Sequence, residues 1–207
     1  MSKSQPLPPG LAYLPDHFDA EAQAALVADI RSVVAAAPLF VPEMPRTGKP
    51  MSVRMTNCGP LGWVTDRTGG YRYQPTHPVT EDPWPAIPQA LLDLWTEVSG
   101  CARPPEACLV NFYDDTAKMG LHQDRDEADL SAPVVSVSLG DQCLFRIGGT
   151  ARNDPTRSFR LSSGDVVVLG GESRLVFHGV DRIYPMSSTL IPGGGRLNLT
   201  LRRVTSP

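Results

Sequence analysis

The chain has 207 residues, of which 41% are hydrophobic and 20% are charged, so it can bury the core of one domain. Its formal net charge of −3 excludes a globally basic surface for nucleic acid or membranes. No segment approaches the roughly 20 apolar residues of a membrane span. The four cysteines form no C-x-x-C pair, and the polar start lacks a signal peptide's apolar core, so we expect a cytoplasmic protein with reduced thiols.

The N-terminal part is predicted to contain helices and long loops. Residues 1–15 are rich in proline, and we expect a flexible tail there. A helix is predicted from Asp19, a good N-cap, to about Ala37, and a second from Pro88 to Ser99. Between them, residues 45–73 carry five basic side chains against one acidic side chain, with short extended pieces near residues 53–57 and 71–74. This local basic surplus could hold phosphates, or could serve solubility alone.

The C-terminal part changes to short apolar segments separated by glycines. Short strands of this kind predict a sandwich or barrel. We therefore expect an α+β protein in which residues 16–100 supply helices and a covering segment and residues 101–207 form a β core, all within one compact domain. The expected strands are 107–113, 134–139, 143–147, 158–161, 165–169, 175–178 and 196–203.

One of these strands has two very different faces. In the segment 196–202 every second residue is leucine, while Arg196, Asn198, Thr200 and Arg202 share the opposite face. If the polar face meets water, it is a solvated edge. If it points inward, its two arginines need a buried anion, because an unpaired buried charge is too costly to keep.

Three residues have the side chains and spacing of a metal site. His122 and Asp124 stand two residues apart, so in an extended segment they point to the same side, and His178 ends an apolar strand. Each alone has an ordinary explanation, as a surface loop or as a buried core histidine. Together they match the facial triad of non-haem Fe(II) enzymes, although a zinc hydrolase could use the same ligands.

The paired arginines favour iron over zinc. An Fe(II) oxygenase needs an electron source, and a 2-oxo acid can supply electrons while it chelates the metal. Such a dicarboxylate needs cationic anchors, which arginine forks provide best. Arg196 and Arg202, with Asn198 between them, are suitable anchors, and Asn111 and Tyr113 share a face of their own strand and could add hydrogen bonds.

Several motifs occur together in a specific order: MTNCGPLGWVTDRTGGYRY, NFYDDTAKMGLHQDRDE, APVVSVSLG, GGTARNDP, GDVVVLGGESRLVFHGV and RLNLTLR. On these stretches the chain from about Ser52 to Arg203 resembles the AlkB family of Fe(II)- and 2-oxoglutarate-dependent nucleic-acid dealkylases. Two places differ from the family pattern. The segment 68–71 has one residue more before Tyr71, and Leu169 stands where tryptophan is expected.

The resemblance implies a double-stranded β-helix, or jelly-roll, with N-terminal helices and a nucleotide-recognition lid. It implies that the catalytic iron ligands are His122, Asp124 and His178. It implies that 2-oxoglutarate is held by Asn111, Tyr113, Arg196, Asn198 and Arg202. It implies that the damaged base and its strand contact Trp63, Tyr71, Asp126 and Arg152.

The implied activity is DNA repair with Fe(II), 2-oxoglutarate and O2. The enzyme would demethylate bases such as 1-methyladenine and 3-methylcytosine, releasing formaldehyde, succinate and CO2. The expected partner is alkylated DNA, single- or double-stranded, with RNA as a further candidate, and we expect a monomer that binds no membrane. Two alternatives stay open. One is a 2-oxoglutarate oxygenase acting on protein or a small molecule, and the other is a catalytically silent jelly-roll that binds nucleic acid.

Overall fold

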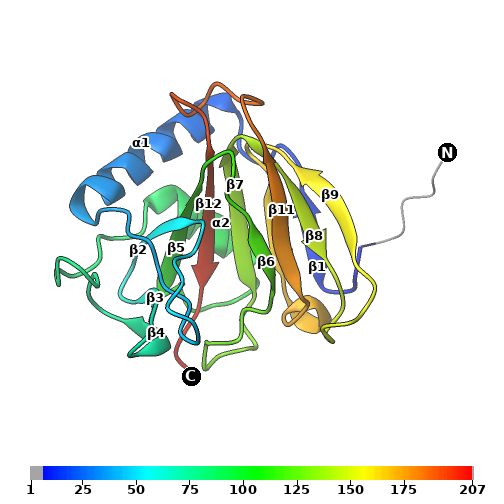
Figure 1. Ribbon diagram of the computed structural model, residues 1–207. Coiled ribbons are helices and arrows are strands. Elements are labelled where there is room, and N and C mark those ends of the chain that lie inside the picture. The colour runs from blue at the N-terminus through cyan, green and yellow to red at the C-terminus, as the bar shows by residue number, and fades with distance from the viewer. Residues whose placement is uncertain (1–6, 207) are drawn as a thin grey trace.

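Two facing antiparallel sheets form the body of the protein, and a separate hairpin lies beside them (Figure 1). The structure is a computed structural model and describes residues 7–206. Among the described helices, none is both long enough and apolar enough to cross a membrane. The paired sheets confirm the predicted α+β jelly-roll.

The six-stranded major sheet has the order β1-β10-β7-β12-β5-β2. β12 lies inside it, paired with β5 and β7, so both of its edges are satisfied by backbone hydrogen bonds. In chain order its strands are β1 (Leu11–Leu14), β2 (Arg54–Cys58), β5 (Ala107–Tyr113), β7 (Val134–Gly140), β10 (Val166–Leu169) and β12 (Arg196–Arg202).

The four-stranded minor sheet, in the order β6-β11-β8-β9, faces the major sheet. Its strands are β6 (Met119–His122), β8 (Gln142–Ile147), β9 (Arg157–Leu161) and β11 (His178–Tyr184). A third sheet consists of β3 (Gly62–Asp66) and β4 (Gly70–Gln74) only, and we call residues 62–74 the lid hairpin. The hairpin thus shares no backbone ladder with either large sheet.

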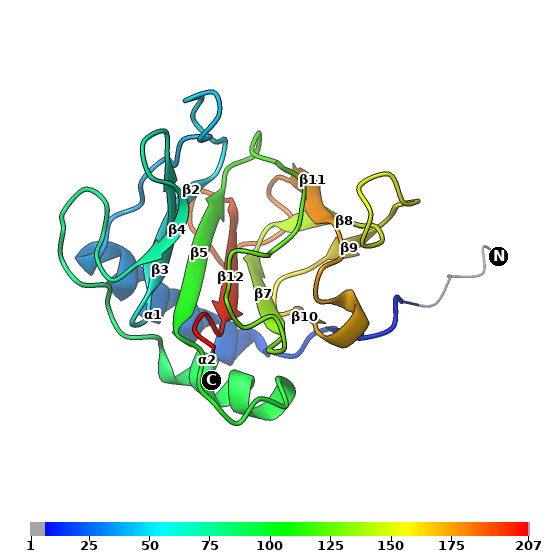
Figure 2. The same ribbon diagram turned by 90° about the horizontal axis from the view of Figure 1, so that it is seen from below.

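Two helices cover the outer face of the major sheet, on the side away from the minor sheet (Figure 2). α1 (Ala20–Ala36) begins as predicted at Asp19, whose carboxylate accepts a hydrogen bond from the Ala22 amide. α2 (Gln89–Val98) begins after Pro88, one residue later than expected. Leu26 and Ile30 of α1 and Trp95 of α2 are buried against the leucines of β12, so this apolar layer supports the strand from behind.

The polar face of β12 points into the protein and its leucine face points toward the helices. Leu197, Leu199 and Leu201 belong to the core under the helices, whereas Arg196 and Arg202 lie between the sheets with only 1% and 6% of their surface exposed. The solvated-edge alternative is therefore wrong. Both guanidinium groups need negative partners inside the protein.

Three local predictions need correction. The expected flexible tail is wrong for Leu11–Leu14, which pair with β10 along its whole length; residues 1–6 lie outside the described part of the chain. The expected strand 175–178 is wrong, because a short 3-10 helix (Gly171–Ser173) precedes a non-strand segment and β11 begins only at His178. The strands β3 and β6 were not predicted, because each is short and their apolar residues do not alternate clearly.

Candidate active site

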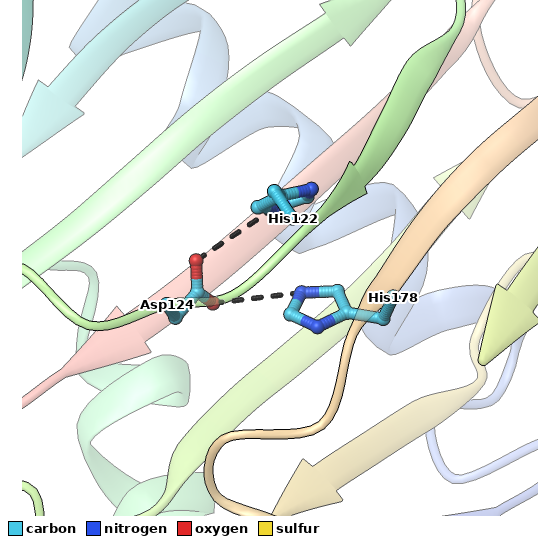
Figure 3. Close-up of side chains that lie close together, drawn as sticks. All are labelled: His122, Asp124 and His178. Atoms are coloured by element: carbon cyan, nitrogen blue, oxygen red, sulfur yellow. Dashed lines mark ion pairs between the residues drawn. The ribbon is translucent and has the colours of Figure 1, made fainter. Parts of the chain in front are cut away.

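Three predicted ligands converge between the sheets (Figure 3). His122 ends β6, Asp124 follows two residues later, and His178 begins β11 directly opposite His122 in the β6–β11 pairing. One ligand atom from each lies within 4.8 Å of the others. The Nε2 atoms of His122 and His178 stand 3.8 and 3.6 Å from the two Asp124 carboxylate oxygens. Sheet register therefore brings together residues that are far apart in the chain.

Backbone contacts orient both imidazole rings. Nδ1 of His122 lies 2.9 Å from the Gly120 carbonyl oxygen, and Nδ1 of His178 lies 3.1 Å from the Val176 carbonyl oxygen. When these nitrogens donate their protons to the carbonyls, Nε2 of each ring keeps a free lone pair. Both lone pairs then point toward Asp124, as a two-histidine, one-carboxylate metal site requires.

The Asp124 carboxylate is held in its charged form. Burial by itself would raise the pKa of Asp124, but the positive charge of Arg202, 2.9 Å away, and the neighbouring His178, His122 and Arg174 together outweigh burial and keep the pKa well below its usual range. Burial and the neighbouring His122 lower the pKa of His178 to about 4. The protein thus offers an anionic carboxylate and a neutral imidazole at neutral pH, which are the protonation states in which both groups bind metal.

The predicted cosubstrate residues line the adjoining inner surface of the major sheet. Arg196 lies opposite Tyr113 in the β12–β5 register, its guanidinium carbon 5.3 Å from the ring centre. Nη2 of Arg196 donates to the Ser138 hydroxyl, while its Nε and Nη1 are buried and have no hydrogen-bond partner among the described residues. Buried cationic donors of this kind fit a carboxylate of a bound ligand.

Two asparagines form the middle of this surface. Asn198 lies opposite Asn111 across the strand pair, and its Oδ1 accepts a long hydrogen bond from Asn111 Nδ2 at 3.4 Å. Oδ1 of Asn111 is buried without a partner in the described part of the chain. These amides and Arg196 leave polar groups unsatisfied on one patch, so the residues present fit a polar cosubstrate.

Arg202 connects the cosubstrate surface to the metal ligands. Its Nη2 pairs with Asp124 at 2.9 Å, and its Nη1 lies 3.2 Å from the Tyr73 hydroxyl and 3.5 Å from Glu127. Its Nε is buried and has no partner among residues 7–206. Burial would lower the pKa of Arg202, but the surrounding negative charges raise it above its ordinary value, so this arginine stays charged.

Three of the four predicted substrate residues meet at the lid hairpin. Indole Nε1 of Trp63 donates to the Asp126 carboxylate at 2.8 Å, and the ring of Tyr71 stacks on Trp63 with 5.7 Å between ring centres. The side chain of Asn57 holds the Trp63 backbone at both its amide and its carbonyl, each at 3.0 Å. The aromatic pair is thus tied to the loop that carries Asp124.

The fourth predicted substrate residue lies apart from this group. Arg152 is exposed in the loop between β8 and β9, and its guanidinium stands 5.7 Å from the ring centre of Phe177, the residue before His178. The structure does not join Arg152 to Trp63, Tyr71 or Asp126 by any hydrogen bond among the described residues. Its substrate role stays a prediction.

Sequence reasoning missed three residues that support the ligands. Arg174 is buried and donates to the Asp124 and Ala132 carbonyls and to the Glu127 carboxylate. Gln123, between two ligands, donates to the Leu175 and Thr150 carbonyls. No local signal marks Arg174 or Glu127, because a charged residue in a short polar segment usually faces water.

The chain matches the model of the 2OG-Fe(II) oxygenase superfamily over residues 10–202. It belongs to that superfamily. It is 58% identical to the alpha-ketoglutarate-dependent dioxygenase AlkB homolog of Caulobacter vibrioides over 94% of this chain and 88% of that protein. It is 44% identical to the alpha-ketoglutarate-dependent dioxygenase AlkB of Escherichia coli over 96% of this chain and 92% of that protein. Within the superfamily the chain therefore belongs to the AlkB family.

More distant comparisons agree. A protein of Schizosaccharomyces pombe named tRNA demethylase abh1 is 35% identical over 68% of this chain and 48% of that protein. A solved structure titled "The structure of OsALKBH1" superposes with a TM-score of 0.79 at 32% identity, covering 96% of this chain and all of that one. Membership of this superfamily means that the chain is an Fe(II)- and 2-oxoglutarate-dependent dioxygenase, which uses O2.

The two departures from the AlkB pattern have simple settings. The additional residue falls in the turn of the lid hairpin. There, Asp66 accepts hydrogen bonds from the Thr68 and Gly69 amides and forms an ion pair with Arg72. Gly70 completes the turn with a φ of +66°. Leu169 is buried at the end of β10 between Leu11 and Val134, its partners across the sheet. Neither place has a hydrogen bond or an ion pair to a metal ligand among the described residues.

Proposed function

We propose that this protein is an oxidative dealkylase of nucleic acids that removes methyl groups from bases alkylated on their pairing edge. The observation that carries the proposal is the bond between Trp63 and Asp126, because it joins an aromatic lid to the loop of Asp124. The printed name of the S. pombe relative, a tRNA demethylase, supports a nucleic-acid substrate. The preferred lesions would be 1-methyladenine and 3-methylcytosine.

His122, Asp124 and His178 would hold Fe(II). With 2-oxoglutarate and O2, the bound iron supplies the oxidation that removes the alkyl group as formaldehyde while the cosubstrate becomes succinate and CO2. The protein's part would be to present two imidazoles and one carboxylate to the metal. The backbone carbonyls of Gly120 and Val176 keep the two rings in that orientation.

The inner face of β12 would bind 2-oxoglutarate. Arg196 and Arg202 supply the positive charge for a dicarboxylate, and the unpartnered Nε atoms of both residues are available donors among the described groups. Asn198 of the same strand would add hydrogen bonds, as would Tyr113 and Asn111 of the neighbouring β5. The leucine face of β12 keeps the strand in place behind these polar groups.

The lid hairpin would receive the damaged base. A base methylated on its pairing edge pairs poorly, so it is the cheapest base to extrude from the stack. Trp63 can stack on it, for roughly 1–3 kcal/mol. Asp126 would attract its positive charge or accept from its amino group, since the hydrogen bond from Trp63 uses only one of its two carboxylate oxygens. Arg152 and the basic residues 45–73 would hold phosphates.

The cellular setting follows from this function. We infer a cytoplasmic monomer whose partner is alkylated DNA, single- or double-stranded, with RNA as a second substrate. The four cysteines are free in the structure, which fits a reducing compartment.

One assay tests the proposal. The protein would first be loaded with Fe(II) in the absence of oxygen. It would then be mixed with O2, 2-oxoglutarate and one methylated DNA or RNA oligonucleotide from a panel. Unmethylated oligonucleotides and methylated peptides would serve as controls. We expect formaldehyde and succinate in equal amounts with methylated oligonucleotides only. Turnover on peptides alone would support an oxygenase acting on proteins, and tight binding without any succinate would support a silent binding module.

A further inference from the structure

A buried carboxylate next to the iron site collects three donors from three different segments. Glu127 accepts a hydrogen bond from the Tyr73 hydroxyl at 2.5 Å and from Arg174 Nη2 at 3.0 Å, and Arg202 Nη1 lies 3.5 Å away. Its side chain has no exposed surface. A carboxylate so completely surrounded holds its partners in fixed positions, because losing any one of them would leave buried charge or a buried acceptor uncompensated.

Tyr73 is the member of this group that comes from the lid hairpin. Its hydroxyl donates to Glu127 and accepts from Arg202 Nη1 at 3.2 Å, across 129 positions of sequence. The hydroxyl thus uses its proton on one partner and a lone pair on the other. Tyr73 lies opposite Trp63 in the hairpin, so the same hairpin carries the predicted base-stacking residue.

The lid hairpin is joined to the loop of residues 124–129 by two side-chain hydrogen bonds in the part of the chain that the structure describes. One, Trp63 to Asp126, joins two predicted substrate residues, so a bound base would contact both of its partners. The other, Tyr73 to Glu127, contacts no predicted substrate residue and continues to Arg202. During base binding, Tyr73 is therefore the contact that can keep the hairpin in register with the iron site.

We propose that Tyr73 is a positioning residue that couples the lid hairpin to the cosubstrate site by holding Arg202 through its hydroxyl and Glu127. The inference rests on the proposed role of Arg202 in binding 2-oxoglutarate. Nη2 of Arg202 is held by Asp124 and its Nη1 by Tyr73 and Glu127, so its Nε edge is left for the ligand. If the hairpin moves away, Nη1 loses its hydrogen bond to Tyr73 and keeps only Glu127, 3.5 Å away, so the guanidinium is held less firmly.

Coupling of this kind is reciprocal. If a closed hairpin favours the Arg202 orientation that binds 2-oxoglutarate, then 2-oxoglutarate must favour the closed hairpin by the same factor. The cosubstrate would therefore order the lid before the nucleic acid arrives. Arg174 anchors the far side of Glu127 through three hydrogen bonds of its own, so movement is expected at the Tyr73 side.

The test compares Tyr73→Phe with Tyr13→Phe. Each change removes only a hydroxyl that donates to a carboxylate, since Tyr13 donates to Asp165 at 2.9 Å on the other side of the fold. The protein would be loaded with Mn(II), which permits binding without turnover. Affinity for 2-oxoglutarate would be measured by calorimetry, and hydrogen exchange of residues 62–74 would be followed with and without 2-oxoglutarate.

In the wild type and in Tyr13→Phe we expect 2-oxoglutarate to slow exchange in the hairpin. In Tyr73→Phe we expect roughly three- to tenfold weaker 2-oxoglutarate binding, because the hydroxyl that holds Arg202 and Glu127 is lost while Arg202 keeps its ionic partners, and no slowing in the hairpin. A Tyr73→Phe protein that keeps either the affinity or the slowing overturns the coupling, as does a wild-type hairpin that is indifferent to 2-oxoglutarate.

A second variant and the wild-type affinity for 2-oxoglutarate distinguish failure of the coupling from failure of the proposed function. Glu127→Gln preserves the shape of the side chain but removes its charge, and it should uncouple the hairpin in the same way. It replaces Tyr73→Phe in the test if that variant fails to fold. A wild-type protein that binds no 2-oxoglutarate at all would refute the proposed function itself. Normal binding without a hairpin response would refute only the role of Tyr73.

Discussion

The space between the sheets and the lid hairpin are built in different ways. Between the sheets, Asp124, Glu127, Arg174 and Arg202 are buried and hold one another through short ionic contacts. The hairpin pairs only with itself, and Tyr71 on it is 49% exposed. In the proposed function, the chemistry that needs fixed geometry therefore lies between the paired sheets, while substrate selection falls to a hairpin that has no ladder to either sheet. Changes between the sheets should therefore abolish activity, and changes in the hairpin should weaken it.

The largest effect is expected at a metal ligand. His178→Ala should lower formaldehyde release from a methylated oligonucleotide by more than about a hundredfold, because altering groups that merely support a ligand already costs roughly 10–100-fold. His17→Ala is the control, since His17 lies near Glu97 of α2 and away from the ligands. Full activity in His178→Ala would refute the iron site.

The second effect distinguishes Arg202, the last residue of β12, from Arg203, which follows it. Arg202→Gln leaves Asp124 without its arginine partner and Glu127 with Arg174 alone, and breaking a buried pair costs about 3–5 kcal/mol. It should raise the 2-oxoglutarate KM by over roughly a hundredfold. Arg203→Gln should leave that KM unchanged, because Arg203 points away and pairs with Glu106 at 3.2 Å. Equal effects of the two variants in steady-state kinetics would contradict the inner-face assignment.

A smaller effect is expected from the hairpin. Trp63→Ala removes the stacking surface, worth roughly 1–3 kcal/mol, and should raise the KM for methylated oligonucleotide by about tenfold or more. Affinity for 2-oxoglutarate should stay within about twofold of the wild type. Trp63→Phe keeps an aromatic face but loses the hydrogen bond to Asp126, so its KM for methylated oligonucleotide should lie between those of the wild type and Trp63→Ala. An unchanged oligonucleotide KM in Trp63→Ala would remove this residue from the substrate site.

The smallest effect concerns stability at high pH, far from the site. Burial and Asp165 raise the pKa of Tyr13 to about 12, above its ordinary value of 10. The folded protein therefore holds this proton more tightly than the unfolded chain. The stabilisation is complete below pH 10 and is lost as pH rises toward 12. Urea unfolding should show a shallower loss over this range in Tyr13→Phe, whereas identical slopes would argue against the raised pKa.

The candidate site was predictable from sequence where side chains with a chemical role are spaced two residues apart, as they are on one face of a strand. The alternation in 196–202 and the His122-x-Asp124 spacing each place side chains on one face of an extended segment, whatever the rest of the fold does. The beginning of α1 was equally clear, because an N-cap acts locally. The strand at Leu11–Leu14 was missed because nearby prolines suggest a tail, and only pairing with β10 makes it a strand.

The sequence alone determined the ligand types, the amphipathic strand β12 and the requirement that its two arginines find an anion if they are buried. Only the tertiary structure decided that they are buried, and that Asp124 and Glu127 meet Arg202 there. It also brought Tyr73 of the lid and Arg174 to the same carboxylate, across 54 and 47 positions. Such contacts depend on strand register and on the packing of one sheet over another, which no local pattern specifies.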